Sequence, residues 1–143
     1  SLIWWEAGAQ PLQMMAAGEV VMTSVYNGRV TTSNRTEGTN FVGVWPGSAY
    51  SIDSWVIVEG TPNIETAHAF INYASDPARQ AQLPEYIAYG PTVIAAADHV
   101  SAETAPLLPT TPANLEVAFE MSTAFWVENI ESLTERFDRW ASQ

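Results

Sequence analysis

Residues 50–74 read YSIDSWVIVEGTPNIETAHAFINYA, and a change of periodicity within them decides the fold class. Residues 50–58 form an apolar run rich in β-branched and aromatic residues, interrupted by one charge, Asp53, and such a run is typical of a strand. After Pro62-Asn63 the apolar residues return at spacings of three and four, which places them on one face of a helix. A strand followed closely by an amphipathic helix predicts both kinds of secondary structure in this part of the chain. The helical face carries Ile64, Ala67, Ile71 and Ala74.

Further strands and a short helix are expected upstream of this unit. Residues 19–26 and 41–45 are apolar, rich in β-branched residues and bounded by turn-forming residues, so each predicts a strand. Residues 2–5 form a shorter run of the same kind. A helix of about two turns is expected over residues 11–17, where a proline suits the first turn and a glycine the C-terminal stop. Residues 31–40 are polar and predict a loop that holds at most a turn of helix.

Helices dominate the downstream half. Asp76-Pro77 combines an N-cap residue with a first-turn proline, so a new helix is expected to start there and run toward Tyr86. The prolines between residues 95 and 112 restrict that region to short helices and extended connections. From Ser122 onward, apolar residues recur at alternating spacings of four and three, which predicts a long amphipathic C-terminal helix. Its apolar stripe consists of Trp126, Ile130, Leu133, Phe137 and Trp140.

Composition excludes several functional classes. The chain has 143 residues, a formal charge of −11 and no cysteine. This excess of negative charge argues against binding nucleic acid or anionic membranes. The lack of cysteine rules out disulfides, thiolate nucleophiles and cysteine-ligated metals within these residues. The sequence also contains no P-loop, no G-x-G-x-x-G and no G-x-S-x-G motif. No cofactor is predicted.

Few side chains have the spacing of a catalytic or metal site. His68 and His99 have no partner acid at a recognisable offset, so they are interpreted as ordinary core or solvated histidines. Asp53 and Glu128 would form the carboxylate pair of a glycoside hydrolase only if the fold brought them roughly 5–10 Å apart. Nothing in the sequence places them together. A hydrolase therefore remains an unfavoured alternative, and the chain is predicted not to be an enzyme.

Aromatic residues placed near acids indicate a different chemistry. Tyr26 ends a predicted strand, Tyr89 lies in a turn, and Trp126 precedes Glu128 by two positions, while Asp53 lies inside an apolar strand. A ligand with ammonium groups on a methylene chain would find aromatic faces and carboxylates in such surroundings. Two alternatives stay open. The aromatics belong to the core, or they form a flat patch on an interaction module.

Several segments, read in order, resemble one protein family. Residues 26–29 read YNGR, residues 62–73 read PNIETAHAFINY, and residues 85–92 read EYIAYGPT. These stretches, with others that together span essentially the whole chain, are similar to the periplasmic polyamine-binding proteins of ABC importers, which are type II extracellular solute-binding proteins. The other segments are residues 5–11, 16–22, 50–55, 125–129 and 134–140.

The resemblance implies a receptor with two α/β lobes that close on a polyamine-like solute and deliver it to an ABC permease in the inner membrane. It covers only the C-terminal portion of such a receptor, so the signal peptide and most of the first lobe would lie upstream. By this analogy residues 1–48 and 103–143 belong to the second lobe and residues 52–98 to the first. The chain would cross between lobes near residues 47–50 and 98–102. A periplasmic location follows.

The resemblance also implies ligand-binding residues. Asp53 would hold an amine, because an acid inside an apolar strand is otherwise costly. Tyr89 and Tyr26 would supply aromatic faces, followed by Trp126 and Glu128 near the start of the last helix.

Arg29 departs from the family pattern. Aligned on residues 26–28, it occupies a position where the family often has an acid that holds an amine. Either Arg29 turns away to pair with a surface acid such as Glu37, or the ligand carries an anionic end there. The second alternative predicts a zwitterionic solute, such as an amino acid or an opine.

Overall fold

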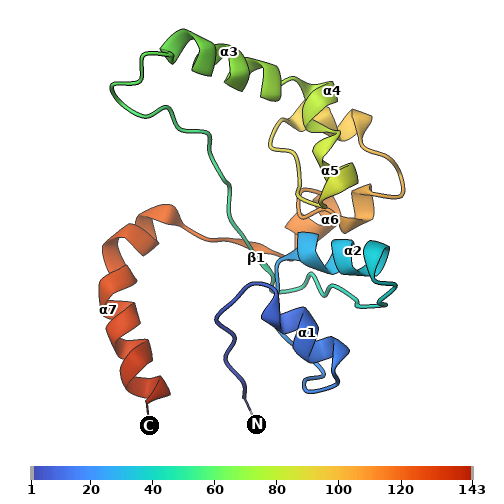
Figure 1. The fold of residues 1–143 in the computed structure, drawn as a ribbon, viewed down its shortest axis with the longest axis vertical. Helices are drawn as coiled ribbons and strands as arrows, with labels where there is room; N and C mark the ends of the chain where they lie inside the picture. Colours follow the sequence, from blue (N-terminus) through green and yellow to red (C-terminus); the bar gives the residue numbers. More distant parts are fainter. Residues whose placement is uncertain (1, 143) are drawn as a thin grey trace.

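The computed structural model describes residues 2–142, which form mainly helices and one small sheet (Figure 1). None of the described helices combines the length and the apolar content that crossing a bilayer requires. In chain order the elements are α1 (Gln10–Ala16), α2 (Asn27–Thr36), β1 (Ala49–Tyr50), α3 (Ile64–Ala74), α4 (Pro77–Gln80), α5 (Leu83–Tyr86), the 3₁₀ helices η1 (Ile94–His99) and η2 (Ala105–Leu107), α6 (Pro112–Leu115), β2 (Phe119–Glu120) and α7 (Thr123–Ala141).

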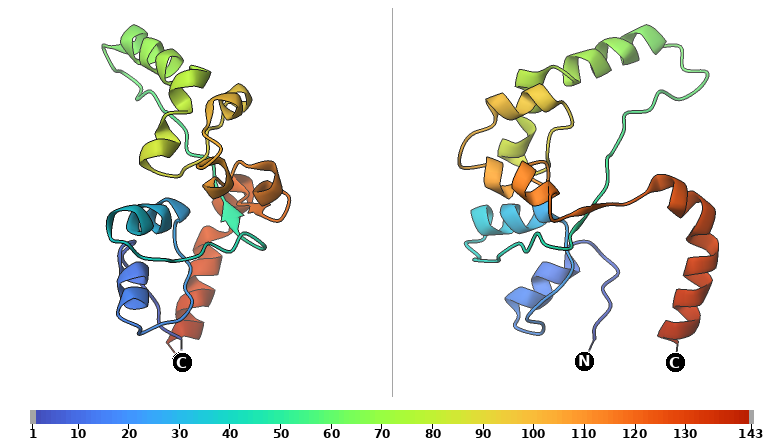
Figure 2. Two further views of the ribbon diagram at one scale, coloured as in Figure 1. Left: turned by 90° about the vertical axis from the view of Figure 1, so that its right-hand side faces the viewer. Right: turned by 180° about the vertical axis from the view of Figure 1, so that it is seen from behind.

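The sheet joins two segments that are far apart in the sequence. β1 and β2 run parallel, with Ala49 opposite Phe119 and Tyr50 opposite Glu120. The ladder extends on both sides, because the Gly47 amide donates to the Val117 carbonyl at 2.8 Å. From β1 the chain passes as an extended trace to α3 and returns through β2 to α7 (Figures 1 and 2). Two connections between the ends of the molecule therefore lie side by side.

The helices predicted from hydrophobic periodicity are confirmed. α3 covers the predicted stripe, and α7 is the long C-terminal helix. The Ser122 hydroxyl oxygen caps α7 by accepting from the Phe125 amide at 3.3 Å. Asp76 caps α4 in the same way, accepting from the Arg79 amide at 3.1 Å, and Pro77 follows it in the first turn. Caps and spacing are local features, so they could be identified without the tertiary structure.

Most of the predicted strands are wrong for the described residues. Of the predicted strand over residues 50–58 only Tyr50 lies in a strand, β1, and residues 2–5, 19–26 and 41–45 are irregular. A strand needs a neighbour for its amides and carbonyls, and residues 2–142 supply one only where β1 meets β2. The apolar side chains of these segments consequently remain exposed: Val21 is 97% exposed, Val42 84% and Val56 81%.

The loop predicted over residues 31–40 is also wrong, because α2 occupies most of it. Its threonines turn their hydroxyls back onto the helix: Thr32 and Thr36 donate to carbonyls one turn earlier, at 2.8 and 2.9 Å. Val30 and Ser33 are buried. The polar composition of this segment does not predict a helix, and tertiary contacts stabilise the helix that forms.

The core of the described residues is small and consists mostly of short side chains. It is divided between two places, where α1 packs against α2 and where α4 packs against η1, and Ala88 and Ala96 are completely buried. Elsewhere apolar groups meet in pairs: Trp4 packs edge-on against Phe137 at 5.1 Å, and Trp55 packs against Phe70 at the same centroid distance. The buried apolar residues are Met14, Val30, Ala81, Ala88, Ala96 and Leu108.

We expect the 143-residue chain, produced by itself, to self-associate or to bind a hydrophobic dye. Large apolar side chains such as Val21, Met22 and Val44 are at least 77% exposed, and unpaired β-rich segments pair readily with other chains. Analytical ultracentrifugation and ANS fluorescence test this expectation. A sedimenting monomer with one sharp calorimetric transition and no dye binding would contradict it.

Candidate functional site

The first turn of α2 is packed against the segment that follows α5. The Asn27 side chain donates its Nδ2 hydrogens to the Ala88 carbonyl and, at 3.4 Å, to the Leu107 carbonyl. At Gly28, a Cβ would stand only 2.6 Å from Ile87 Cγ1 and 2.7 Å from Tyr89 Cε1. Tyr89 therefore packs on the first turn of α2. The residue that it contacts there, Gly28, follows the exposed Tyr26 by two positions. Two predicted site residues from distant parts of the sequence are thus brought together.

Arg29 belongs to the same turn and is exposed. Three guanidinium atoms lie 3.2–3.4 Å from where a Cβ would stand at Gly8, so the side chain lies over the Gly8 backbone. Glu37, the surface acid considered above as its partner, instead accepts from the Ser33 hydroxyl at 2.9 Å. Arg29 thus belongs to the first turn of α2, while its guanidinium group lies over the residues just before α1.

The start of α2 is also electrostatically suited to an anion. Tyr26 precedes the helix in an extended conformation and supplies no side-chain cap. The Arg29 and Val30 amides donate to the Tyr26 carbonyl, at 3.0 and 3.4 Å, so the Asn27 and Gly28 amides are the ones without an intrahelical acceptor, at the helix end that carries a partial positive charge. An arginine at this end adds a full positive charge and a planar fork of donors that matches a carboxylate. This turn, with Tyr89 against it, is our candidate binding surface.

The other predicted residues lie outside this cluster. Trp126 lines a groove of about 430 Å³ beside the β1–β2 pair, and Glu128 is exposed one half-turn further along α7. Asp53 is exposed and lies three residues after β1. Among the described residues, no hydrogen bond joins Asp53, Trp126 or Glu128 to Tyr26, Arg29 or Tyr89. The groove is lined by Ala49, Phe119, Glu120, Met121, Ser122, Phe125 and Trp126.

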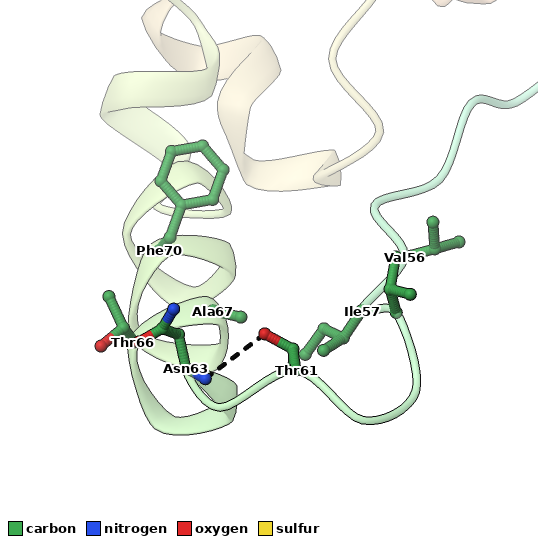
Figure 3. A pocket seen from close by; sticks show the side chains of 8 residues that line it. Val56, Ile57, Thr61, Asn63, Thr66, Ala67 and Phe70 are labelled. Atoms are coloured by element: carbon green, nitrogen blue, oxygen red, sulfur yellow. Dashed lines mark hydrogen bonds between the residues drawn. The ribbon is translucent and has the colours of Figure 1, made fainter.

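A second groove, of about 450 Å³, lies between the extended segment 56–58 and α3 (Figure 3). Val56, Ile57 and Phe70 face this space, and the Asn63 amide donates to the Thr61 hydroxyl at 3.3 Å on its border. None of its lining residues is charged, so it offers no opposite charge to an ammonium or a carboxylate group. Within residues 2–142 no three acidic or histidine side chains are grouped as metal ligands would be.

Sequence reasoning missed Asn27, Gly28 and Ile87 as parts of the candidate surface. Asn27-Gly28 was interpreted as a turn after a strand, because that dipeptide is a common turn signal. The contacts that give these residues a role come from a segment about 60 positions away, and one sequence contains no signal for such a pairing. Gly28 has no side chain that would mark it as functional.

The sequence of the chain is similar to known protein sequences. Residues 1–110 match the family model of bacterial extracellular solute-binding proteins. The chain is 45% identical over 140 residues to the gamma-aminobutyric acid-binding protein of Pseudomonas aeruginosa, an alignment that covers 98% of this chain and 40% of that protein. The chain thus spans about two fifths of the length of the curated relative that it matches.

The structure of the chain is also similar to solved structures of solute-binding proteins. An ABC transporter substrate-binding protein from Bradyrhizobium japonicum superposes with a TM-score of 0.80 at 36% identity, over 97% of this chain and 43% of that one. A periplasmic binding protein of A. tumefaciens B6 in complex with glucopine superposes with a TM-score of 0.75 at 28% identity, over 95% of this chain and 42% of that one.

These matches confirm the predicted fold class, because the chain is part of a periplasmic binding protein fold, with short strands, flanking helices and the long helix α7. The relatives are solute-binding proteins, in keeping with a role other than catalysis. They do not single out the polyamine receptors to which the segments were compared. The chain belongs to the bacterial extracellular solute-binding protein family.

Proposed function

We propose that this chain is part of an ABC-importer receptor that captures an amino-acid-like, zwitterionic solute in the periplasm and delivers it to an inner-membrane permease. The observation that carries the proposal is Arg29 at the uncapped start of α2, in the turn on which Tyr89 packs. The names of the relatives support the class of solute, because one is a gamma-aminobutyric acid-binding protein and another was solved with glucopine.

In this proposal each end of the solute has its own partners. Arg29 and the first-turn amides of α2 hold the carboxylate, through charge-assisted hydrogen bonds. Tyr26 and Tyr89 cover the aliphatic part. Asp53 or Glu128 receives the amine once the two parts of the molecule close, with Trp126 beside it.

A polyamine fits the same residues less well. A guanidinium within about 6 Å of a bound ammonium costs roughly 2–3 kcal/mol at an effective dielectric constant near 20, about a hundredfold in affinity. Arg29 therefore disfavours the polyamine-like solute that the first resemblance implied and favours the zwitterionic alternative.

We further propose that β1 and β2 are the hinge between two lobes. They are two adjacent crossings held by a short ladder, and the chain departs from them toward opposite ends of the molecule (Figure 1). We propose the first crossing at residues 47–50, as the family resemblance implies. For the second we favour residues 117–121 over 98–102, because the hydrogen-bonded pairing is found there. The remaining part of the receptor chain would complete both lobes.

A thermal-shift and calorimetric screen on the full-length receptor tests the proposed function. We expect γ-aminobutyrate or a related amino acid to bind with micromolar affinity, equivalent to about −8 kcal/mol, and to raise the melting temperature by mass action. Putrescine and spermidine are the matched cationic controls, since they share the methylene chain and lack the carboxylate. Tight binding of either, with no response to any amino-acid-like solute, would contradict the proposal. Solute recovered chemically unchanged would exclude the carboxylate-pair hydrolase.

A further inference from the structure

The first turn of α2 is shaped to receive the segment after α5. Gly28 has helical backbone geometry, since it is not among the positive-φ glycines, so the backbone itself does not demand glycine. What demands glycine is space: a Cβ there would lie 2.6–2.7 Å from Ile87 and Tyr89 side-chain atoms, well inside van der Waals contact. Asn27 fixes the same segment through the Ala88 carbonyl. Asn27 and Gly28 together form a socket for residues 87–89.

The other end of α2 is held to the same region. Arg35 donates from Nη1 to the Glu85 carbonyl at 2.6 Å. The Glu85 carboxylate is itself fixed, because it accepts from the Ser101 and Thr104 hydroxyls, both at 3.1 Å. Thr104 is 2% exposed, so the Glu85 side chain, although exposed, is tied to one buried hydroxyl. α2 is thus attached to α5 and its flanking residues at both ends.

This attachment joins chain segments on opposite sides of β1. α2 precedes β1, whereas α5 and residues 87–89 follow it, beyond the extended trace and α3 (Figures 1 and 2). If the β1–β2 pair is the hinge, a rotation about it separates α2 from residues 85–89. The contact would then exist only in the closed arrangement.

We propose that the socket of Asn27 and Gly28, assisted by Arg35, is a latch that sets the population of the closed receptor. The proposal rests on the proposed function, in which a solute touches Arg29 on one side of the latch and Tyr89 on the other. A solute held between them stabilises the closed arrangement, and the latch raises the apparent affinity by increasing the fraction of molecules competent to bind.

The Gly28→Ala substitution distinguishes an effect on the latch from an effect on the stability of α2, because it changes the two in opposite directions. Alanine is a better helix former than glycine, so the substitution favours α2 itself and acts against the contact with residues 87–89. Gly43→Ala is the matched control, since a Cβ at Gly43 meets nothing within 4 Å and its φ is not positive. A second variant, Gly28→Ala with Ile87→Ala, removes the atoms that lie 2.6 and 3.0 Å from the new Cβ and should restore part of the contact.

The experiment compares these variants in the full-length receptor by small-angle scattering and by calorimetric titration with γ-aminobutyrate. We expect Gly28→Ala to expand the solute-bound receptor and to weaken binding about tenfold or more. Gly43→Ala should match the wild type, and the double variant should recover part of the loss. Equal dimensions and affinities for Gly28→Ala and Gly43→Ala would overturn the latch. So would a loss that Ile87→Ala does not relieve.

The proposed latch and the proposed function can be contradicted independently, because different measurements test them. If the wild type binds no amino-acid-like solute, the proposed function is wrong. The scattering comparison of solute-free Gly28→Ala and Gly43→Ala then decides the latch alone: a more expanded Gly28→Ala protein supports it, and identical dimensions overturn it.

Discussion

Replacing Arg29 by aspartate in the full-length receptor is expected to weaken binding of an amino-acid-like solute by about a thousandfold or more. The substitution removes the attraction between a guanidinium and the solute carboxylate and introduces a repulsion of similar size. At about 6 Å and an effective dielectric constant near 20, each of these effects amounts to roughly 2–3 kcal/mol. Calorimetric titration with γ-aminobutyrate measures the change.

The same substitution should strengthen binding of putrescine or spermidine, because an acid then stands where the polyamine receptors often have one. Arg136→Asp is the matched control: it makes the same change of charge on α7, which lies apart from α2 in Figure 1 and in the right-hand view of Figure 2. If wild-type receptor binds spermidine tightly and Arg29→Asp leaves that affinity unchanged, Arg29 is outside the site and the anionic-end proposal fails.

Leu108→Ala is expected to lower the free energy of unfolding by about 2–5 kcal/mol, the range for a large side chain removed from a packed core. Leu108 is 2% exposed, and it lies in the turn that also supplies the Leu107 carbonyl to Asn27. The substitution leaves a cavity that the surrounding backbone cannot fill completely.

The neighbouring Leu107→Ala is a control for this prediction, since Leu107 is 38% exposed and loses less contact. Urea unfolding of both variants in the full-length receptor, followed by tryptophan fluorescence, gives the comparison. Equal losses for the two substitutions would contradict the burial that distinguishes them.

Part of the candidate site was predictable from the sequence. Tyr26, Arg29 and Tyr89 were proposed from aromatic and charged patterning and from a family resemblance, and α2 brings them into one neighbourhood. The roles of Asp53, Trp126 and Glu128 stay predictions, because their contacts with a solute depend on the closure of the two lobes. Asn27 and Gly28 became visible only through contacts with a segment about 60 residues away.

The sequence by itself determined the features that depend on near neighbours. The stripe of α3, the capped start of α4 and the long amphipathic α7 follow from spacings of three and four residues and from cap residues within one turn. Charge and the absence of cysteine excluded whole classes of chemistry for the same reason, since each is a property of residue type alone.

Only the tertiary structure decided the features that depend on a distant partner. Residues 19–26 and 41–45 have the composition of strands, yet they pair with nothing among the described residues, because a strand is stable only where a neighbour satisfies its backbone. Conversely, polar α2 is a helix because it packs Val30 into the core and its threonine hydroxyls donate to carbonyls of the same helix. Local propensities are weak compared with burial and with backbone hydrogen bonding, so these segments took the conformation that their contacts stabilise.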